Sequence, residues 1–152
     1  MEPIHTKINK YLQVFSQSHS SCFTLERGVC AICDEQGDLV MVLEVPPNSD
    51  VLILHSHIST LSNIKDSAVY STLLTMNFNV SDMKGTWFSL RNNQVYLLTQ
   101  RKIEDLDEIT FSHYLNGFIL HTKEIMQKTI DSFNKESLST TEYTPTQWER
   151  FV

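Results

Sequence analysis

The spacing of hydrophobic residues near the start of the chain predicts a helix. Apolar side chains recur at steps of four, four and three, and such steps place them in one stripe on a helical surface. The positions in this stripe are Ile4, Ile8, Leu12 (or Tyr11) and Phe15. The polar run Ser16–Ser21 follows, and we expect it to end the helix.

Short apolar runs separated by turn residues come next, and they predict strands. The first β region holds two short extended stretches, Phe23–Leu25 and Val29–Cys33. A second strand is expected at Leu39–Val45 and a third at Val51–Ile58. Gly37 allows a tight turn within Asp34–Asp38. Pro46–Asp50 interrupts the strand pattern, because proline has no N–H to donate to a ladder. Connections this short favour antiparallel neighbours over crossover helices.

The second half of the chain again has a helix, two strands and a helix. The apolar line of the predicted helix Lys65–Phe78 is Val69, Leu73, Met76 and Val80, with Leu74 and Phe78 extending the same face. Strands are expected at Thr86–Arg91 and Gln94–Gln100, joined by a two-residue turn at Asn92–Asn93. A long helix is expected from Asp105 or Asp107 to Phe133, and it would be about 40 Å long.

The order of these elements is α-β-β-β-α-β-β-α, which predicts an α+β fold. We expect two layers, with helices packed on a mostly antiparallel, twisted sheet. No low-complexity block or internal repeat divides the sequence, so residues 1–133 are interpreted as one domain. The remaining residues, 134–152, are interpreted as a polar C-terminal tail that Trp148 and Phe151 can pin at its end.

Composition and charge narrow the classes of function. The chain has 152 residues, with 12 Lys and Arg against 18 Asp and Glu, for a formal net charge of −6. An acidic balance argues against nucleic-acid binding and against docking on anionic lipid, both of which need clustered cations. Three cysteines and no apolar block of signal-peptide length near the start fit a reducing cytoplasm. We therefore expect a soluble cytoplasmic protein with no membrane insertion.

Two pairs of residues are candidates for a thiol or metal site, one of cysteines and one of histidines. Cys30 and Cys33 make a C-x-x-C pair, and His55 and His57 stand two apart. Side chains three apart on a strand point to opposite faces, so the thiols are badly placed to pair. The histidines lack the usual spacing of a zinc finger. A small thiol or metal enzyme built on these four residues stays open as an alternative, but the prediction is a protein with no catalytic residues, no metal and no cofactor.

Two strands are apolar on both faces, which indicates a partner. A sheet covered by one helical layer should alternate apolar and polar positions, yet Leu39–Leu43 and Val51–Leu54 do not. Trp87 and Phe88 likewise point to opposite faces. One small domain has little material to cover so much apolar surface. A second subunit or a client chain would cover it; strands buried entirely in the core are the alternative.

In their order, several segments resemble the Tir-chaperone (CesT-like) family of bacterial type III secretion chaperones. The segments are Gly28–Ile32, the apolar strand ending at Val45, Leu73–Phe78, Gly85–Leu90, Val95–Leu98 and the helix entry Leu106–Asp107. The resemblance covers about residues 4 to 133. The tail is longer than the family needs, and the cysteines and histidines match no family motif.

The resemblance implies a homodimer without catalytic activity that binds the N-terminal region of a secreted effector and keeps it soluble and secretion-competent. By analogy the effector-binding residues would be Ile8, Leu12, Phe15, Phe23, Leu25 and Val29. The residues of the dimer contact would be Leu73, Leu74, Asn77, Phe78, Trp87 and Phe88. Whether the tail binds the secretion ATPase, the client or nothing stays open. A generic dimeric interaction domain outside secretion is a further alternative.

Overall fold

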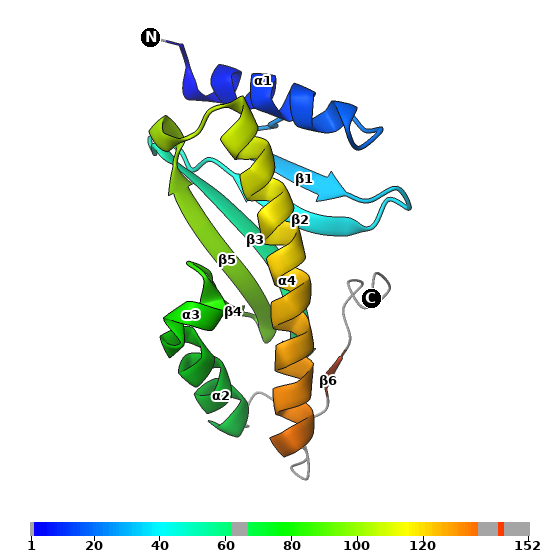
Figure 1. Ribbon diagram of the computed structural model, residues 1–152, viewed down its shortest axis with the longest axis vertical. Coiled ribbons are helices and arrows are strands. Elements are labelled where there is room, and N and C mark those ends of the chain that lie inside the picture. The colour runs from blue at the N-terminus through cyan, green and yellow to red at the C-terminus, as the bar shows by residue number, and fades with distance from the viewer. Residues whose placement is uncertain (1, 62–66, 137–142, 145–152) are drawn as a thin grey trace. The chain divides into compact units, whose positions relative to one another are not determined.

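A computed structural model describes residues 2–61, 67–136 and 143–144 and shows an α+β fold (Figure 1). The elements in chain order are α1 (Ile4–Gln17), β1 (Val29–Cys33), β2 (Leu39–Glu44), β3 (Val51–Leu61), α2 (Ser67–Phe78), α3 (Val80–Met83), β4 (Trp87–Arg91), β5 (Gln94–Lys102), α4 (Glu108–Glu136) and β6 (Tyr143–Thr144). A single 3-10 turn at Ile103–Asp105 precedes α4. The predicted order is confirmed, with α3, the 3-10 turn and β6 as additions.

The strands form an open sheet in the order β1-β2-β3-β5-β4, and β6 pairs with β3 off this path. The pairs β1–β2, β2–β3 and β4–β5 are antiparallel, as the short turns predict. The unpredicted pair β3–β6 is antiparallel too. Asn92 and Asn93 take positive φ values of 49° and 64° between β4 and β5. This conformation gives the two-residue hairpin turn that the Asn–Asn pair predicts.

The chain divides into two compact units. The first unit comprises Met1–His55 and Gln100–Ile119, and the second comprises Ser56–Thr99 and Leu120–Val152. β3, β5 and α4 each contribute residues to both units. The domain boundary predicted at residue 133 stays a prediction, because most of the tail lies outside the described residues, Trp148 and Phe151 included.

In the first unit, α1 and the beginning of α4 bury their apolar stripes. The side chains that are at most 1% exposed are Ile8, Leu12, Phe15, Met41, Leu43, Leu52, Leu54, Phe111 and Leu115. The Tyr11 ring centroid lies 5.4 Å from that of Phe111, and its hydroxyl donates to the Leu106 carbonyl at 3.2 Å. Leu12 is therefore the core residue of the stripe, and the alternative, Tyr11, lies at its polar margin.

The segment Phe23–Leu25 is not a strand, contrary to the sequence prediction. Its backbone bonds to side chains of α1: the Phe23 N–H donates to Ser16 Oγ at 2.9 Å, and the Leu25 N–H donates to Asn9 Oδ1 at 2.8 Å. Because α1 takes these donors, the segment does not pair with β1 along its length. Residues 23–25 therefore pack as a loop against α1 and are not part of the sheet.

Two helix ends show how local capping decides the boundaries. Asp107 Oδ1 accepts the Thr110 N–H at 2.8 Å and starts α4, so Asp107 rather than Asp105 is the cap. In the second unit, Asn79 Oδ1 accepts the Asp82 N–H and starts α3. The prediction that Val80 continues the buried line of α2 is therefore wrong, since a new helix begins there. Helix formation from residue 65 cannot be compared, because residues 62–66 lie outside the described part.

Candidate interaction surfaces

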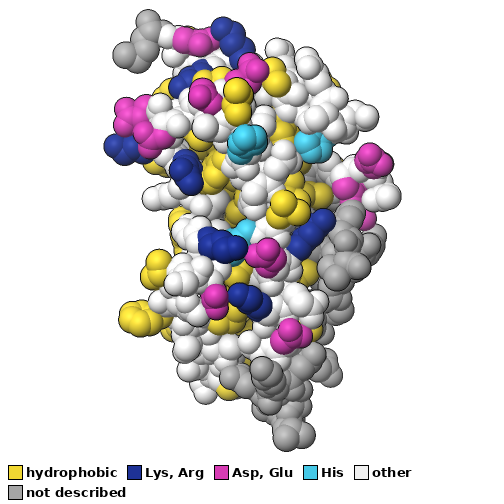
Figure 2. Space-filling model, viewed as in Figure 1, with side chains coloured by type: hydrophobic (Ala, Val, Ile, Leu, Met, Phe, Trp, Pro, Cys, Tyr) yellow, Lys and Arg dark blue, Asp and Glu magenta, His cyan; other side chains and the backbone are white. Residues whose placement is uncertain are grey.

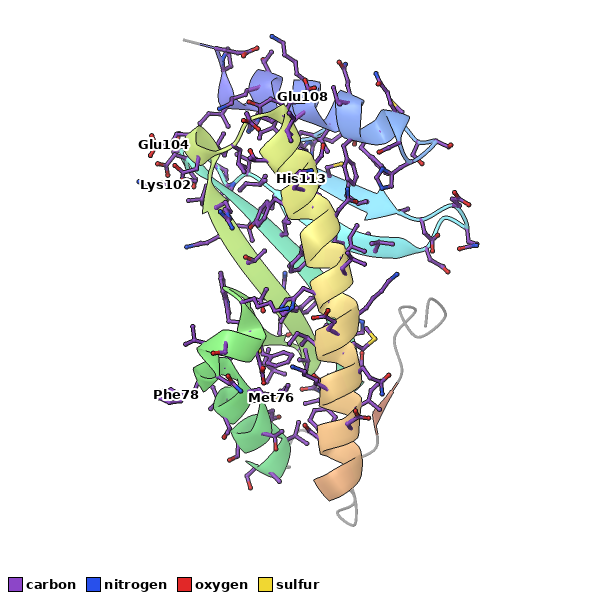
Figure 3. All side chains as sticks on the ribbon, viewed as in Figure 1. Met76, Phe78, Lys102, Glu104, Glu108 and His113 are labelled. Atoms are coloured by element: carbon purple, nitrogen blue, oxygen red, sulfur yellow. The ribbon has the colours of Figure 1, made fainter. Side chains whose placement is uncertain are left out.

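An apolar patch covers the outside of α2 and α3 in the second unit. Leu74, Phe78 and Val80 are 68%, 89% and 77% exposed, and together they form what we name the α2–α3 patch. Figure 2 shows hydrophobic side chains at the surface over these helices. Figure 3 shows Phe78 projecting outward from α2, with Met76 on the other side of the helix. Apolar side chains this exposed and this close in sequence are typical of a contact surface.

A shallow groove lies at the α2–α3 patch, and Phe78 and Val80 of the patch are among its lining residues. Its volume is about 780 Å³, and its lining consists of the consecutive residues Thr75, Met76, Asn77, Phe78, Asn79, Val80 and Ser81. The turn at Asn79 creates the groove, because α2 stops there and α3 leaves in a new direction. Leu73, one of the predicted dimer residues, is only 5% exposed and supports the patch from below.

Asn77 joins α2 to β4 through both ends of its amide. Its Oδ1 accepts the Phe88 N–H at 2.7 Å, and its Nδ2 donates to the Phe88 carbonyl at 3.3 Å. β4 is the last strand on its side of the sheet, so these backbone groups would otherwise be open to another strand. Asn77 and Phe88, both predicted as dimer residues, thus bond to each other within the chain. Phe88 is 7% exposed, and Trp87 is half-buried.

A buried histidine fixes the corner between α3 and β4 to α4. His121 is 8% exposed, and its Nε2 lies 2.8 Å from the Met83 carbonyl and 3.1 Å from Thr86 Oγ1. Nε2 is therefore the protonated nitrogen, because a carbonyl can only accept. On the surface, Lys84 pairs with Glu124 at 3.5 Å, and Lys128 pairs with Asp82 at 3.4 Å. These contacts hold in place the short helix that carries Val80.

The residues predicted to bind an effector lie in the first unit, at different depths. Ile8, Leu12, Phe15 and Phe23 are between 0% and 6% exposed, so they form the core beneath the surface. Leu25 is half-buried, and Val29 is 41% exposed at the start of the outermost strand, β1. Of the six, Leu25 and Val29 therefore expose apolar atoms at the surface.

The outer face of β1–β3 continues this surface. Val29 lies opposite Glu44, which lies opposite Ile53, and these side chains are all at least partly exposed. The opposite face of these strands is buried. There Cys30 lies opposite Leu43, which lies opposite Leu54, and each side chain is at most 4% exposed. Residues 42–44 of β2 and 51–54 of β3 thus bury one face and leave the other partly exposed. Earlier in β2, the consecutive residues Val40 and Met41 are 7% and 1% exposed, so β2 is closed to solvent at both positions.

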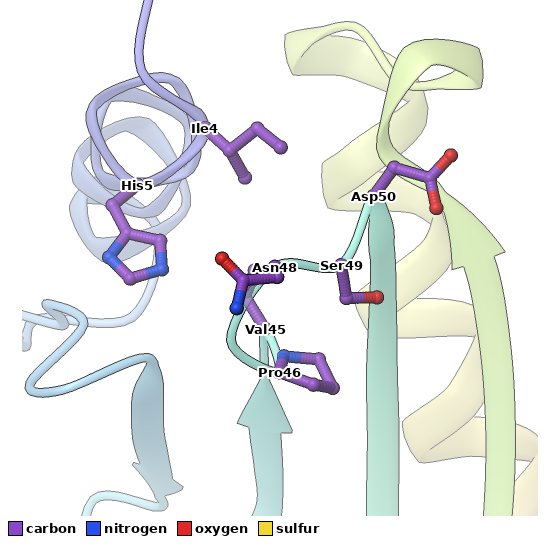
Figure 4. Close-up of a pocket in the computed structure, with 7 residues that line it drawn as sticks. All are labelled: Ile4, His5, Val45, Pro46, Asn48, Ser49 and Asp50. Atoms are coloured by element: carbon purple, nitrogen blue, oxygen red, sulfur yellow. The ribbon is translucent and has the colours of Figure 1, made fainter.

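A pocket of about 390 Å³ opens between α1 and the turn from β2 to β3 (Figure 4). Its lining includes Ile4 and His5 from α1 and Pro46 and Asn48 from the turn. Gly28 lies beside it with a φ of 82°, and a Cβ there would come within 2.6 Å of the Val45 carbonyl oxygen. Glycine is required at this approach, which brings the loop before β1 against the end of β2.

The thiol and metal alternative finds no support in the structure. Burial raises the pKa of the Cys30 thiol to about 11, so the thiol stays protonated at neutral pH and is a poor nucleophile or ligand. His55 Nε2 lies 3.9 Å from Glu44, and His57 Nε2 lies 3.0 Å from Thr60 Oγ1. Within the described residues, no three His, Cys, Asp or Glu side chains gather to hold a metal ion.

The described helices include none that is long and apolar enough to cross a membrane.

The sequence analysis missed Val80 as a surface residue. The signal that could have found it is Asn79 followed three residues later by Asp82, a spacing typical of a helix start.

Comparison with known proteins identifies similar folds and the family of the chain. No curated protein sequence matches it significantly. The fold is similar to that in the "Crystal Structure of the ExsC-ExsE Complex", with a TM-score of 0.69 and 14% identity over 83% of this chain and 96% of the other. It is also similar to that in the "Structure of the HopA1-SchA Chaperone-Effector Complex", with a TM-score of 0.59 and 16% identity over 84% and 96%.

A third similar structure is the Yersinia pestis type III secretion chaperone SycH in complex with a stable fragment of YscM2. Its TM-score is 0.50, with 18% identity over 75% of this chain and 95% of the other. At the level of sequence, the family model of the Tir chaperone protein (CesT) family matches residues 11–126. That match spans most of the chain, and so the chain belongs to the Tir chaperone protein (CesT) family.

Proposed function

We propose that this chain works as a homodimer that holds the N-terminal region of a secreted effector in an extended, soluble and secretion-competent form. Its family makes it a type III secretion chaperone and not an enzyme. The observation that carries the proposal is the exposed α2–α3 patch, together with the open apolar face of the first unit. Two such surfaces on one small chain fit two kinds of partner: a second copy and a client.

The second copy is assigned to the second unit. Leu74 and Phe78 expose most of their side chains there, and Leu73, Trp87 and Phe88 lie close in sequence to the patch. Burying apolar area of this kind is worth about 25 cal/mol per Å². A self-complementary contact between identical patches gives a closed dimer, the commonest form of homo-oligomer.

The client is assigned to the first unit. Val29 and Leu25 offer apolar atoms beside an outermost strand, and an extended segment can add to such an edge while placing alternate side chains in pockets. The core beneath this surface supports it, and its residues include Ile8, Leu12, Phe15 and Phe23. A client that orders only on binding gives up entropy, which keeps the complex releasable.

The similar structures support an effector as the client. They are the ExsC–ExsE complex, the HopA1–SchA chaperone–effector complex and SycH in complex with a fragment of YscM2. We infer that the protein acts in the bacterial cytoplasm, where an effector is held before it is secreted. A contact between the tail and the secretion ATPase remains a prediction from the family resemblance.

Light scattering of the purified chain tests the dimer. The wild type should have twice the mass of one chain, and Phe78→Asp should shift it toward the monomer because a charge would be buried at the contact. Ile109→Asp is the matched control, since Ile109 is 66% exposed but lies in the first unit. A monomeric wild type would contradict the dimer.

Affinity capture from the native bacterium, followed by mass spectrometry, tests the client. The wild type should retain one or a few secreted proteins through their N-terminal regions, and Val29→Asp should retain less of them while staying dimeric. Capture of no secreted protein, with the dimer intact, would instead favour a generic dimeric interaction domain.

A further inference from the structure

β3 has a third strand partner, β6, which lies outside the residues that the family model matches. In the sheet order β3 lies between β2 and β5, yet β6 also pairs with it, with Thr60 opposite Thr144 and Leu61 opposite Tyr143. β3 is 11 residues long, and its register with β2 covers Ile53, Leu54 and His55. β6 therefore lies on β3 beyond the part that β2 occupies.

The edge that β6 uses can be identified from one hydrogen bond. The Leu61 N–H donates to the Asn93 carbonyl, next to the start of β5, at 2.8 Å. Successive N–H groups of a strand point to opposite edges, so the N–H of Thr60 points away from β5. Thr144 lies opposite Thr60. The far end of β3 thus has an edge that accepts an extended segment, and the chain's own C-terminal part lies on it.

We propose that the edge of β3 at Thr60–Leu61 is a strand-addition site for an extended peptide, and that β6 occupies it in cis until such a peptide displaces it. The identity of the incoming peptide as part of the client rests on the proposed function. Strand addition uses backbone hydrogen bonds, so it tolerates many sequences. This suits a chaperone that recognises an unfolded segment rather than a folded surface.

Two observations support displacement rather than permanent closure. β6 is only two residues long, so a longer segment forms more ladder hydrogen bonds with β3 than β6 does. The family match ends at residue 126, so β6 lies outside the part of the chain that the family model describes. A short cis strand also protects an edge from random pairing, a device that sheet proteins use widely.

Hydrogen–deuterium exchange of the full-length chain tests the cis pairing. Thr144→Pro removes the N–H of Thr144 and should release β6, because proline cannot donate to a ladder. The Thr60 amide should then exchange roughly tenfold faster than in the wild type. Thr146→Pro is the matched control and should leave this rate unchanged. Equal rates in the wild type and Thr144→Pro would overturn the proposal.

A fluorescent peptide of residues 139–146 tests addition in trans. It should bind the Thr144→Pro protein about tenfold more tightly than it binds the wild type or Thr146→Pro, because in those two β6 competes for the same edge. The same peptide with Thr144 replaced by proline should bind none of the three proteins. Equal binding to all three proteins, or binding to none, would overturn the strand-addition site.

Both measurements work without an effector, so the two proposals fail separately. If the peptide binds as expected but capture from the bacterium returns no secreted protein, the proposed function fails and the edge site stands. If an effector is captured but the peptide does not distinguish the variants, the edge site fails and the chaperone function stands.

Discussion

The two units distribute polar and apolar residues in opposite ways. Among the described residues, the first unit buries one polar side chain, Ser16, within an otherwise apolar core. The buried polar residues of the second unit are Ser56, Ser59, Thr86, Thr99, His121, Thr122 and Thr129. Several of these bond locally, as Thr129 does to the Ile125 carbonyl at 2.7 Å. Within the described part of the chain, buried Ser59 Oγ has no hydrogen-bond partner.

The outside of each unit shows the complementary difference. Among the described residues, the large exposed hydrophobic ones of the second unit are Leu74, Phe78, Val80, Leu90 and Leu120, and those of the first are Val29, Leu39 and Ile109. A unit with hydroxyls inside and large apolar groups outside gains less from its own core. The comparison teaches that the first unit is stabilised within one chain, whereas the second leaves more apolar surface for the second copy that we propose.

Exchanging one phenylalanine in each unit for alanine should give the largest contrast. Phe15 is 1% exposed, so Phe15→Ala should cost about 3–5 kcal/mol of unfolding free energy through lost burial and a cavity. Phe78 is 89% exposed, so Phe78→Ala should leave the stability of the monomer nearly unchanged and weaken self-association. Urea denaturation at several protein concentrations separates the two effects. Equal losses at low concentration would contradict the comparison.

Removing the buried histidine should have the next largest effect. His121→Ala removes one of three donors to the Met83 carbonyl, which keeps the N–H and hydroxyl of Thr86, and it opens a cavity beside Thr86. The lost hydrogen bond and the cavity should together cost about 1–3 kcal/mol. His121→Gln should recover part of this, because its amide nitrogen can reach the same carbonyl. Exposed His113 on the same helix provides the control, His113→Ala. Thermal unfolding measures all three, and identical melting of His121→Ala and the control would refute the role.

The Asn77 amide should matter less for stability than for pairing. Asn77→Ala removes two hydrogen bonds to Phe88 and should cost about 1–2 kcal/mol. Because it uncovers the outer edge of β4, it should also promote aggregation, visible as scattering on storage. Asn116→Ala, an exposed change on α4, should do neither. A stable and monodisperse Asn77→Ala protein would show that the edge needs no cover.

The smallest expected effect is a pH dependence from His57. Burial lowers the pKa of His57 below its ordinary value of 6.5. The unfolded chain then binds the proton at a higher pH than the folded chain, so acidification through 6.5 favours unfolding. Replacing the ring by glutamine should flatten the stability profile between pH 7 and the lower folded-state pKa. His113→Gln serves as the control; a profile unchanged by His57→Gln would exclude this histidine as the cause.

Periodicity predicted the first unit well because its residues obey simple patterns. The α1 stripe, β2 and the first residues of β3, 51–55, follow apolar runs that the structure buries on at least one face. The segment Phe23–Leu25 was the exception. Its backbone donors bond to Ser16 and Asn9, side chains that lie earlier in the chain and give no signal in the local pattern.

The second unit was less predictable because its contacts run against periodicity. The apolar line through Val69 and Leu73 is buried, but Val80 follows a new helix start and lies outside. The side-chain contact between Asn77 and Phe88 joins residues 11 apart in sequence, which no helical or strand period predicts. Pairing of β6 with β3 joins residues more than 80 apart and depends only on backbone groups. A pattern of side chains carries no information on such a contact.

The contact between Asn77 and Phe88 also limits how many copies can assemble. Strands joined edge to edge can recruit further copies without end, which is how sheets grow into fibres. Here a side-chain amide holds the outward N–H and C=O of Phe88, so the sheet does not extend from β4 into a neighbour at this residue. In the dimer that we propose, copies meet through side chains such as Phe78 instead. An assembly built that way would close at a fixed size, and each member would keep its remaining surface for the proposed client.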